Sequence, residues 1–221
     1  MRIDTKNKII YFANPKTGST SLRKVMNKYC DFDIMKILKN NSMYHDHWGV
    51  SKYNTIFQIL NKETNSNIDL NNYFSFTTIR NPWDKVVSGF KYQKCDKNGN
   101  AWYTSNYDKN TEGEYSFSEF VRDIHDKDYW CGIGIPNAEY FCFDENNKQA
   151  IKKIYPIETL TKDILKNDIK KYVNIDYDIS DIPKLNITKK DDFRKYYTEE
   201  WMINIVKNVY KKDIELGNYK F

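Results

Sequence analysis

The residues best suited to chemistry stand near the start of the chain, in a loop that reads Pro-Lys-Thr-Gly-Ser-Thr-Ser-Leu from position 15. Its glycine permits a tight turn, and the N–H groups that open the following helix converge on one point. The lysine adds a full positive charge, and the hydroxyl side chains add hydrogen-bond donors. These features predict an anion-binding loop, whose candidate residues are Pro15, Lys16, Thr17, Gly18, Ser19, Thr20 and Ser21.

This loop differs from the phosphate-binding loop of the P-loop NTPases. No Gly-Lys-[Ser/Thr] sequence closes it, and Lys16 precedes the glycine instead of following it. An ordinary helix start rich in Ser and Thr remains the alternative on these residues alone.

A second candidate site lies where a strand meets a helix, in the segment Arg-Asn-Pro-Trp-Asp from position 80. Residues 73–79 are aromatic and β-branched, which predicts a buried strand. Asn81 is a favoured N-cap, and Pro82 suits the first helical position. Arg80 follows that strand at the sheet edge where the first loop is expected, so we expect both to face one ligand. An arginine in this place is also common as a purely structural residue.

Two histidines, His45 and His47, stand close together in the segment Tyr-His-Asp-His-Trp. A zinc site would need further ligands, and the remaining histidine, His125, falls in a separate predicted helix. We therefore predict no metal site. Surface or hydrogen-bonded histidines are the simplest interpretation of the pair.

The elements that must position these residues alternate between strands and helices. This alternation predicts an α/β fold with a central parallel sheet flanked by helices, and ligands beyond the carboxyl ends of the strands. Residues 94–115 are expected to be a long polar loop. The predicted strands are 9–14, 73–79, 140–143 and 154–157, and the predicted helices are 19–29, 50–62, 82–90, 116–125, 160–173 and 198–212.

The composition limits the classes of protein to which this chain can belong. A chain of 221 residues with 40% hydrophobic residues suits one domain, residues 1–221, and excludes a disordered chain. The net charge of +5 is spread along the chain, which suits an anionic ligand but predicts no nucleic-acid partner. We see neither a membrane-span-length apolar run nor a secretory leader, so we expect no membrane partner and a cytoplasmic location.

Taken together, residues 16–22 and 80–90 resemble the two cofactor loops of the Golgi-type carbohydrate sulfotransferases (sulfotransferase family 2) and their bacterial and viral relatives. Residues 156–158, 186–190, 196–198 and 213–221 resemble further segments of that family. The resemblance implies a P-loop-NTPase-like three-layer fold. It also implies 3′-phosphoadenosine-5′-phosphosulfate (PAPS) as sulfuryl donor, the bisphosphate PAP as product and no metal. By the same match the first loop binds the 5′-phosphosulfate, and Arg80 and Ser88 bind the 3′-phosphate, assisted by Lys189 or Lys190.

The two histidines resemble a His-x-His pattern of heparan sulfate 2-O-sulfotransferase. That match implies that His47 is the general base and that His45 contacts the acceptor. In the expected sulfuryl transfer, Lys16 stabilises the leaving group. The implied acceptor is a hydroxyl group, expected on a saccharide. Two alternatives remain: a nucleotide or small-molecule kinase that uses the same loop, and a non-catalytic module that binds a phosphorylated or sulfated ligand. The kinase would need a Gly-Lys-[Ser/Thr] loop and an acidic magnesium ligand, which the sequence does not display.

Overall fold

The computed structural model describes residues 2–30, 32–33, 72–94, 116–125, 138–144, 146–179, 182 and 192–221. These residues gather into two compact units, which we describe one at a time. The first unit contains Met1–Ile79 and Ala138–Asn186, and the second contains Arg80–Asn137 and Ile187–Phe221. That residues 1–221 act as one domain stays a prediction.

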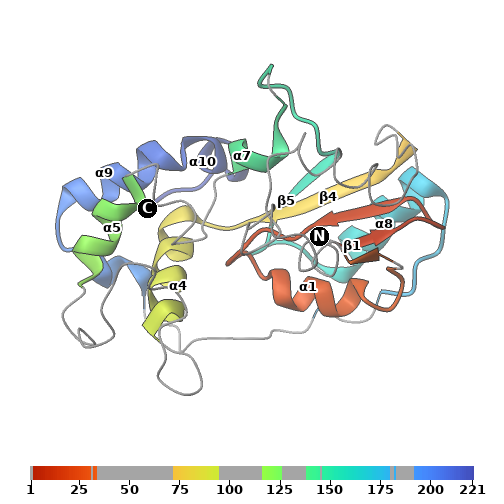
Figure 1. The fold of residues 1–221 in the computed structure, drawn as a ribbon, viewed down its shortest axis with the longest axis horizontal. Coiled ribbons are helices and arrows are strands. Elements are labelled where there is room, and N and C mark those ends of the chain that lie inside the picture. Colours follow the sequence, from red (N-terminus) through yellow and green to blue (C-terminus); the bar gives the residue numbers. More distant parts are fainter. Residues whose placement is uncertain are drawn as a thin grey trace, which may run out of the picture. The chain divides into compact units, whose positions relative to one another are not determined.

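The first unit is built on a five-stranded sheet in the order β3-β1-β2-β4-β5 (Figure 1). The neighbours β2, β4 and β5 run parallel, as predicted, whereas β1 is antiparallel to both β2 and β3. The sheet is therefore mixed, because residues 5–8 between β1 and β2 are too few for a parallel crossover. The strands are β1 Arg2–Asp4, β2 Ile9–Phe12, β3 Phe32–Asp33, β4 Phe74–Ile79 and β5 Lys153–Pro156.

One face of this sheet packs against two helices, α1 (Ser19–Met26) and α8 (Lys162–Val173). Strands β2 and β4 are buried along their whole lengths, as their aromatic and β-branched residues predict. The shared core contains Ile9, Tyr11, Leu22, Val25, Met26, Phe74, Phe76, Leu165 and Ile169. A mixed α/β sheet with flanking helices is thus confirmed, and the three-layer P-loop-like arrangement stays a prediction.

The predicted strand over residues 140–143 is wrong. Helix α7 (Ala138–Cys142) occupies most of this segment, and Phe143 forms only an isolated bridge with Gln149. The aromatic residues favour a strand, but the good helix formers Ala138 and Glu139 start a helix just before them.

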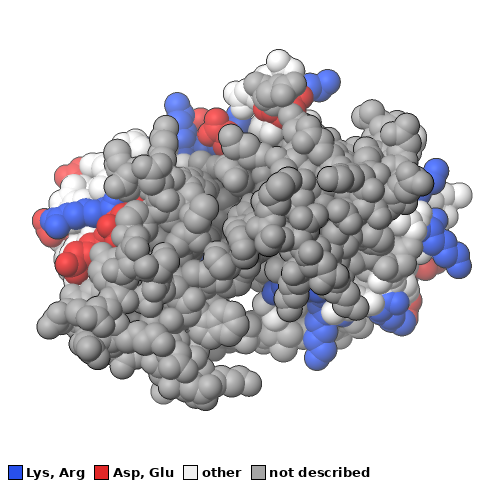
Figure 2. Space-filling model, in the orientation of Figure 1, with Lys and Arg blue, Asp and Glu red and all other residues white. Residues whose placement is uncertain are grey.

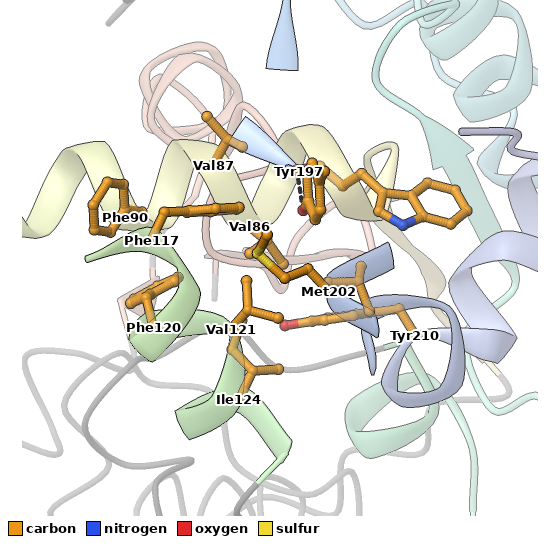
Figure 3. Close-up of a cluster of buried hydrophobic side chains, with 12 residues drawn as sticks. Val86, Val87, Phe90, Phe117, Phe120, Val121, Ile124, Tyr197, Met202 and Tyr210 are labelled. Atoms are coloured by element: carbon orange, nitrogen blue, oxygen red, sulfur yellow. Dashed lines mark hydrogen bonds between the residues drawn. The ribbon is translucent and has the colours of Figure 1, made fainter. Parts of the chain in front are cut away.

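The second unit is helical, with an aromatic core. Most of the side chains shown in Figure 3 come from helices α4, α5 and α9, such as Phe90 from α4 and Met202 from α9. Tyr197 and Tyr210 lie just outside these helices. The Phe90 and Phe117 rings meet edge to face, with 5.3 Å between centroids. The elements are α4 Pro82–Lys94, α5 Phe117–His125, the 3₁₀ helix η4 Phe193–Tyr196, α9 Glu200–Val209 and α10 Lys211–Gly217.

The C-terminal helix differs from its prediction at both ends. It begins two residues later than predicted, at Glu200, and Glu199 is the N-cap residue, with extended backbone. The single helix predicted over 198–212 is divided at Tyr210, whose backbone leaves helical geometry, and α10 follows. Asn218, not Gly217, takes the left-handed position that ends α10. None of the described helices combines the length and apolar character needed to cross a bilayer.

Candidate functional site

The loop between β2 and α1 has the backbone of an anion-binding turn. Lys16 and Gly18 both lie in the left-handed region, with φ of 62° and 75°. Left-handed residues in such a turn bring successive N–H groups to one side of the chain. A Cβ atom on Gly18 would lie 3.0 Å from Cδ1 and Cγ1 of Ile157. The left-handed φ and this tight contact both favour glycine at position 18.

Helix α1 begins directly after Gly18, and no side chain caps its N-terminus. Its first turn also contains no acidic residue. The opening N–H groups and the positive end of the helix dipole thus meet no capping side chain or carboxylate of this helix. Arg23 reaches back toward this end, with Nε 3.4 Å from the Ser19 carbonyl oxygen and Nη2 3.4 Å from Thr20 Oγ1. This arrangement suits an anionic ligand.

The inner side of the loop is tied to strand β4 by buried hydrogen bonds. Thr17 Oγ1 donates to the Asn14 carbonyl oxygen at 2.9 Å and lies 2.8 Å from Thr78 Oγ1. Asn14 Nδ2 donates to the Thr78 carbonyl oxygen at 3.0 Å. Asn14, Thr17 and Thr78 each have 0% exposed surface. Sequence reasoning missed Asn14 and Thr78, although the polar residues Ser75, Thr77 and Thr78 in a buried strand were a signal for the latter.

The second candidate site lies in the second unit, at the start of α4. Asn81 Oδ1 accepts hydrogen bonds from the backbone N–H groups of Trp83, at 3.1 Å, and Asp84, at 3.4 Å. Asn81 is therefore the predicted cap, and Pro82 is the first helical residue. These contacts confirm the strand-to-helix junction.

Arg80 is held by a carboxylate one turn into this helix. Its Nε and Nη2 atoms donate to the same Asp84 oxygen, Oδ2, at 2.9 and 2.7 Å. The two side chains are 25% and 36% exposed. Asp84 thus fixes the direction of the Arg80 guanidinium. The i,i+4 spacing of opposite charges was the signal for this pair, which the sequence analysis did not use.

Ser88 lies one turn beyond Asp84, so both residues belong to the same face of α4. Its side chain is half-buried and makes no hydrogen bond with the described part of the chain. A hydroxyl in this position suits an additional ligand contact beside Arg80.

The C-terminal segment packs against the same junction. Asn81 Nδ2 donates to the Lys220 carbonyl oxygen at 3.1 Å, and the Phe221 and Trp83 rings lie 5.5 Å apart. The Tyr197 hydroxyl donates to the Trp83 carbonyl oxygen at 3.0 Å, the bond drawn dashed in Figure 3. Two motif segments far apart in the sequence therefore lie together within this unit.

The remaining predicted site residues, His45, His47, Lys189 and Lys190, lie outside the described residues. Their roles stay predictions. In Figure 2, basic and acidic side chains of the described residues both appear along the rim of the visible face. The assignment of the anion-binding loop depends on its local geometry.

Comparisons with known proteins identify the family of this chain. The chain matches the model of the sulfotransferase family over residues 1–220. It is 28% identical to carbohydrate sulfotransferase 10 of Danio rerio over 140 residues, which cover 55% of this chain and 36% of that protein. The match thus spans only about a third of that curated relative. No solved structure matches significantly. Because the family match covers nearly its whole length, the chain belongs to the sulfotransferase family.

Proposed function

We propose that this protein transfers a sulfuryl group from PAPS to a hydroxyl group of a saccharide. Family membership supports sulfuryl transfer, and the carbohydrate sulfotransferase among its relatives supports a saccharide acceptor. The observation that carries the proposal is the loop at Lys16 and Gly18. There a left-handed turn leads into a helix that no side chain caps.

The residues of this loop fit a phosphosulfate. Gly18 has no side chain, so its backbone can approach a ligand closely, and a Cβ there would crowd Ile157. The helix start and Lys16 supply positive charge, and no acidic side chain in the first turn opposes it. We assign residues 15–21 to the phosphosulfate, and Arg80, Ser88 and Lys189 or Lys190 to the 3′-phosphate.

PAPS would supply an activated sulfuryl group: a bond forms between sulfur and the acceptor oxygen while the bond to the 5′-phosphate oxygen breaks, leaving PAP. Lys16 would neutralise the charge that develops on that departing oxygen. The N–H groups that follow Gly18 would hold the non-bridging oxygens, as an oxyanion hole does. The loop thus contributes fixed positive charge and positioning.

The acceptor proton requires a base. A neutral histidine titrates near pH 6.5 and can accept a proton at physiological pH. We assign this step to His47, with His45 as an acceptor contact. In this scheme no residue is assigned to a metal ion.

Thermal unfolding in the presence of nucleotides tests the proposal. A ligand at 100 times its Kd adds about 2.7 kcal/mol, roughly 5–11 °C for a domain of this size. We expect this shift with PAP and much smaller shifts with ADP or ATP at equal concentration. The absence of a shift with PAP, or a larger one with ATP and magnesium, would contradict the proposal and favour a kinase.

A further inference from the structure

The buried contacts beneath the anion-binding loop converge on one residue of the neighbouring strand. Thr78 Oγ1 donates to the Thr17 carbonyl oxygen at 3.0 Å, and the Thr78 carbonyl accepts from Asn14 Nδ2 at 3.0 Å. Asn14 and Thr17 bracket Lys16 in the chain. Thr78 therefore holds the loop on both sides of Lys16, whose φ is 62°.

Such a backbone conformation is costly for a residue other than glycine. It persists only where the surrounding contacts fix it. Within the described part of the chain, the bonds through Thr78 are contacts of this kind, since they join the segment around Lys16 to the rigid centre of the sheet.

The hydroxyl groups in this network share their protons. Thr17 has one hydroxyl proton, which it donates to the Asn14 carbonyl oxygen, and Thr78 has one, directed at the Thr17 carbonyl oxygen. The two hydroxyl oxygens also lie 2.8 Å apart, and either hydroxyl can be the donor in that contact. Removing the Thr78 hydroxyl would leave buried acceptors at Thr17 without this donor, and the loop would shift to satisfy them.

We infer that Thr78 is a positioning residue for the anion-binding loop, whose hydroxyl keeps the loop backbone directed at the 5′-phosphosulfate. This inference rests on the proposed function. It assigns to Thr78 an effect on ligand affinity and turnover without contact with the ligand.

The adjacent residue, Thr77, offers a matched control. Both threonines have 0% exposed surface. Consecutive residues of a strand point to opposite faces, and Thr77 Oγ1 donates at 2.7 Å to the carbonyl oxygen of Phe12, in strand β2. Valine at either position removes one buried hydroxyl at nearly constant volume. Only at position 78 does it remove contacts to Thr17, next to Lys16, while the bond from Asn14 Nδ2 to the Thr78 carbonyl remains.

The test compares Thr78→Val, Thr77→Val and the rescue variant Thr78→Ser by calorimetric titration with PAP and with adenosine 3′-phosphate. We expect Thr78→Val to raise the Kd for PAP by about tenfold or more, because misplaced groups contribute little to binding or catalysis. Its affinity for adenosine 3′-phosphate, which lacks the 5′-phosphate, should stay unchanged. Thr77→Val and Thr78→Ser should keep the wild-type affinity for PAP within about threefold.

Urea unfolding of the same variants separates positioning from stability. We expect both valine variants to lower the urea midpoint, and Thr78→Val by at least as much as Thr77→Val, since the Thr78 hydroxyl makes two buried contacts and the Thr77 hydroxyl makes one. Equal effects of both valine variants on the Kd for PAP would overturn the inference. Should Thr78→Val not fold, Asn14→Ala removes the other bond to Thr78 and is interpreted in the same way. Wild-type protein that does not bind PAP would instead overturn the proposed function, and this inference with it.

Discussion

Lys85 and Asp213 form an ion pair of 3.6 Å in which neither side chain has exposed surface. Lys85 belongs to α4, the helix that starts at the Arg80 junction, and Asp213 belongs to α10. The Lys85 ammonium group also lies 5.2 Å from the centroid of the Tyr210 ring. The pair therefore joins the two motif-bearing segments of the second unit at a place that water does not reach.

Breaking this pair should destabilise the protein strongly. Lys85→Met or Asp213→Leu alone leaves one buried charge without its counter-ion, which costs about 3–5 kcal/mol. The double variant should lose much less than the sum of the two, because both charges are gone. Urea unfolding of the four proteins measures this. Single variants that each cost less than about 1 kcal/mol would show that the pair is not a buried ion pair in solution.

Replacing Lys16 should affect turnover more than affinity. Lys16→Met keeps the side-chain stem but removes the charge at the departing oxygen, so we expect kcat to fall by about 100-fold or more. Sulfuryl transfer from labelled PAPS to the best acceptor of a saccharide panel provides the measurement. Lys24→Met, an exposed change in α1, is the control. A kcat that stays within about threefold of the wild type would exclude this role.

Replacing His47 and replacing His45 should change different kinetic parameters. His47→Ala should lower kcat by about 10²–10⁴-fold, the usual contribution of a general base. It should leave the affinity for PAP unchanged. His45→Ala should mainly raise the KM of the acceptor, because it removes a binding contact. The reverse pattern in the same transfer assay would exchange the two assignments.

Tyr11 should contribute to the alkaline limit of stability. Burial raises the pKa of its phenol well above the ordinary value of 10.0. The unfolded chain therefore loses this proton at lower pH than the folded protein does. The contribution of the protonated Tyr11 phenol to the free energy of unfolding is complete below pH 10. It is lost as the pH rises above that value.

Tyr11→Phe removes this contribution. The Thr78 hydroxyl lies near Tyr11 Oη but makes no hydrogen bond of normal geometry with it, so the change should alter stability at pH 7 by less than about 1 kcal/mol. Above pH 10, the free energy of unfolding should fall less steeply in Tyr11→Phe than in the wild type. Urea midpoints across this pH range give the comparison, and parallel curves for the two proteins would refute the expectation.

Local sequence signals predicted the parts of the site that depend on a few neighbouring residues. Asn81 and Pro82 signal a helix start from their own chemistry, and Gly18 signals a left-handed turn. The helix break at Tyr210 has no such signal, since neither glycine nor proline stands there. Whether a charged residue such as Lys85 is buried depends on contacts with residues far away in the sequence, such as Asp213.

The contacts that hold the loop could not be predicted in this way. Asn14 and Thr17 bond to Thr78 across sequence separations of 64 and 61 residues. Such pairs follow from the register of β2 against β4, which no single motif contains. The sequence likewise suggested a parallel sheet because the short strand β1 and its turn carry too few residues to stand out.

The most direct test of PAPS use is whether the protein recognises the 3′-phosphate through Arg80. Calorimetric titrations should compare PAP with adenosine 5′-phosphate, which lacks that group, for the wild type, Arg80→Met and the control Arg122→Met. Arg122 lies on α5, with its guanidinium 5.0 Å from the centroid of the Trp201 ring.

We expect the wild type and Arg122→Met to bind PAP at least about tenfold more tightly than adenosine 5′-phosphate, since hydrogen bonds to a charged group are worth about 1.5–3 kcal/mol. Arg80→Met should lose most of this preference and still bind adenosine 5′-phosphate as the wild type does. Equal affinity of the wild type for the two nucleotides, or a preference that survives Arg80→Met, would contradict the assignment.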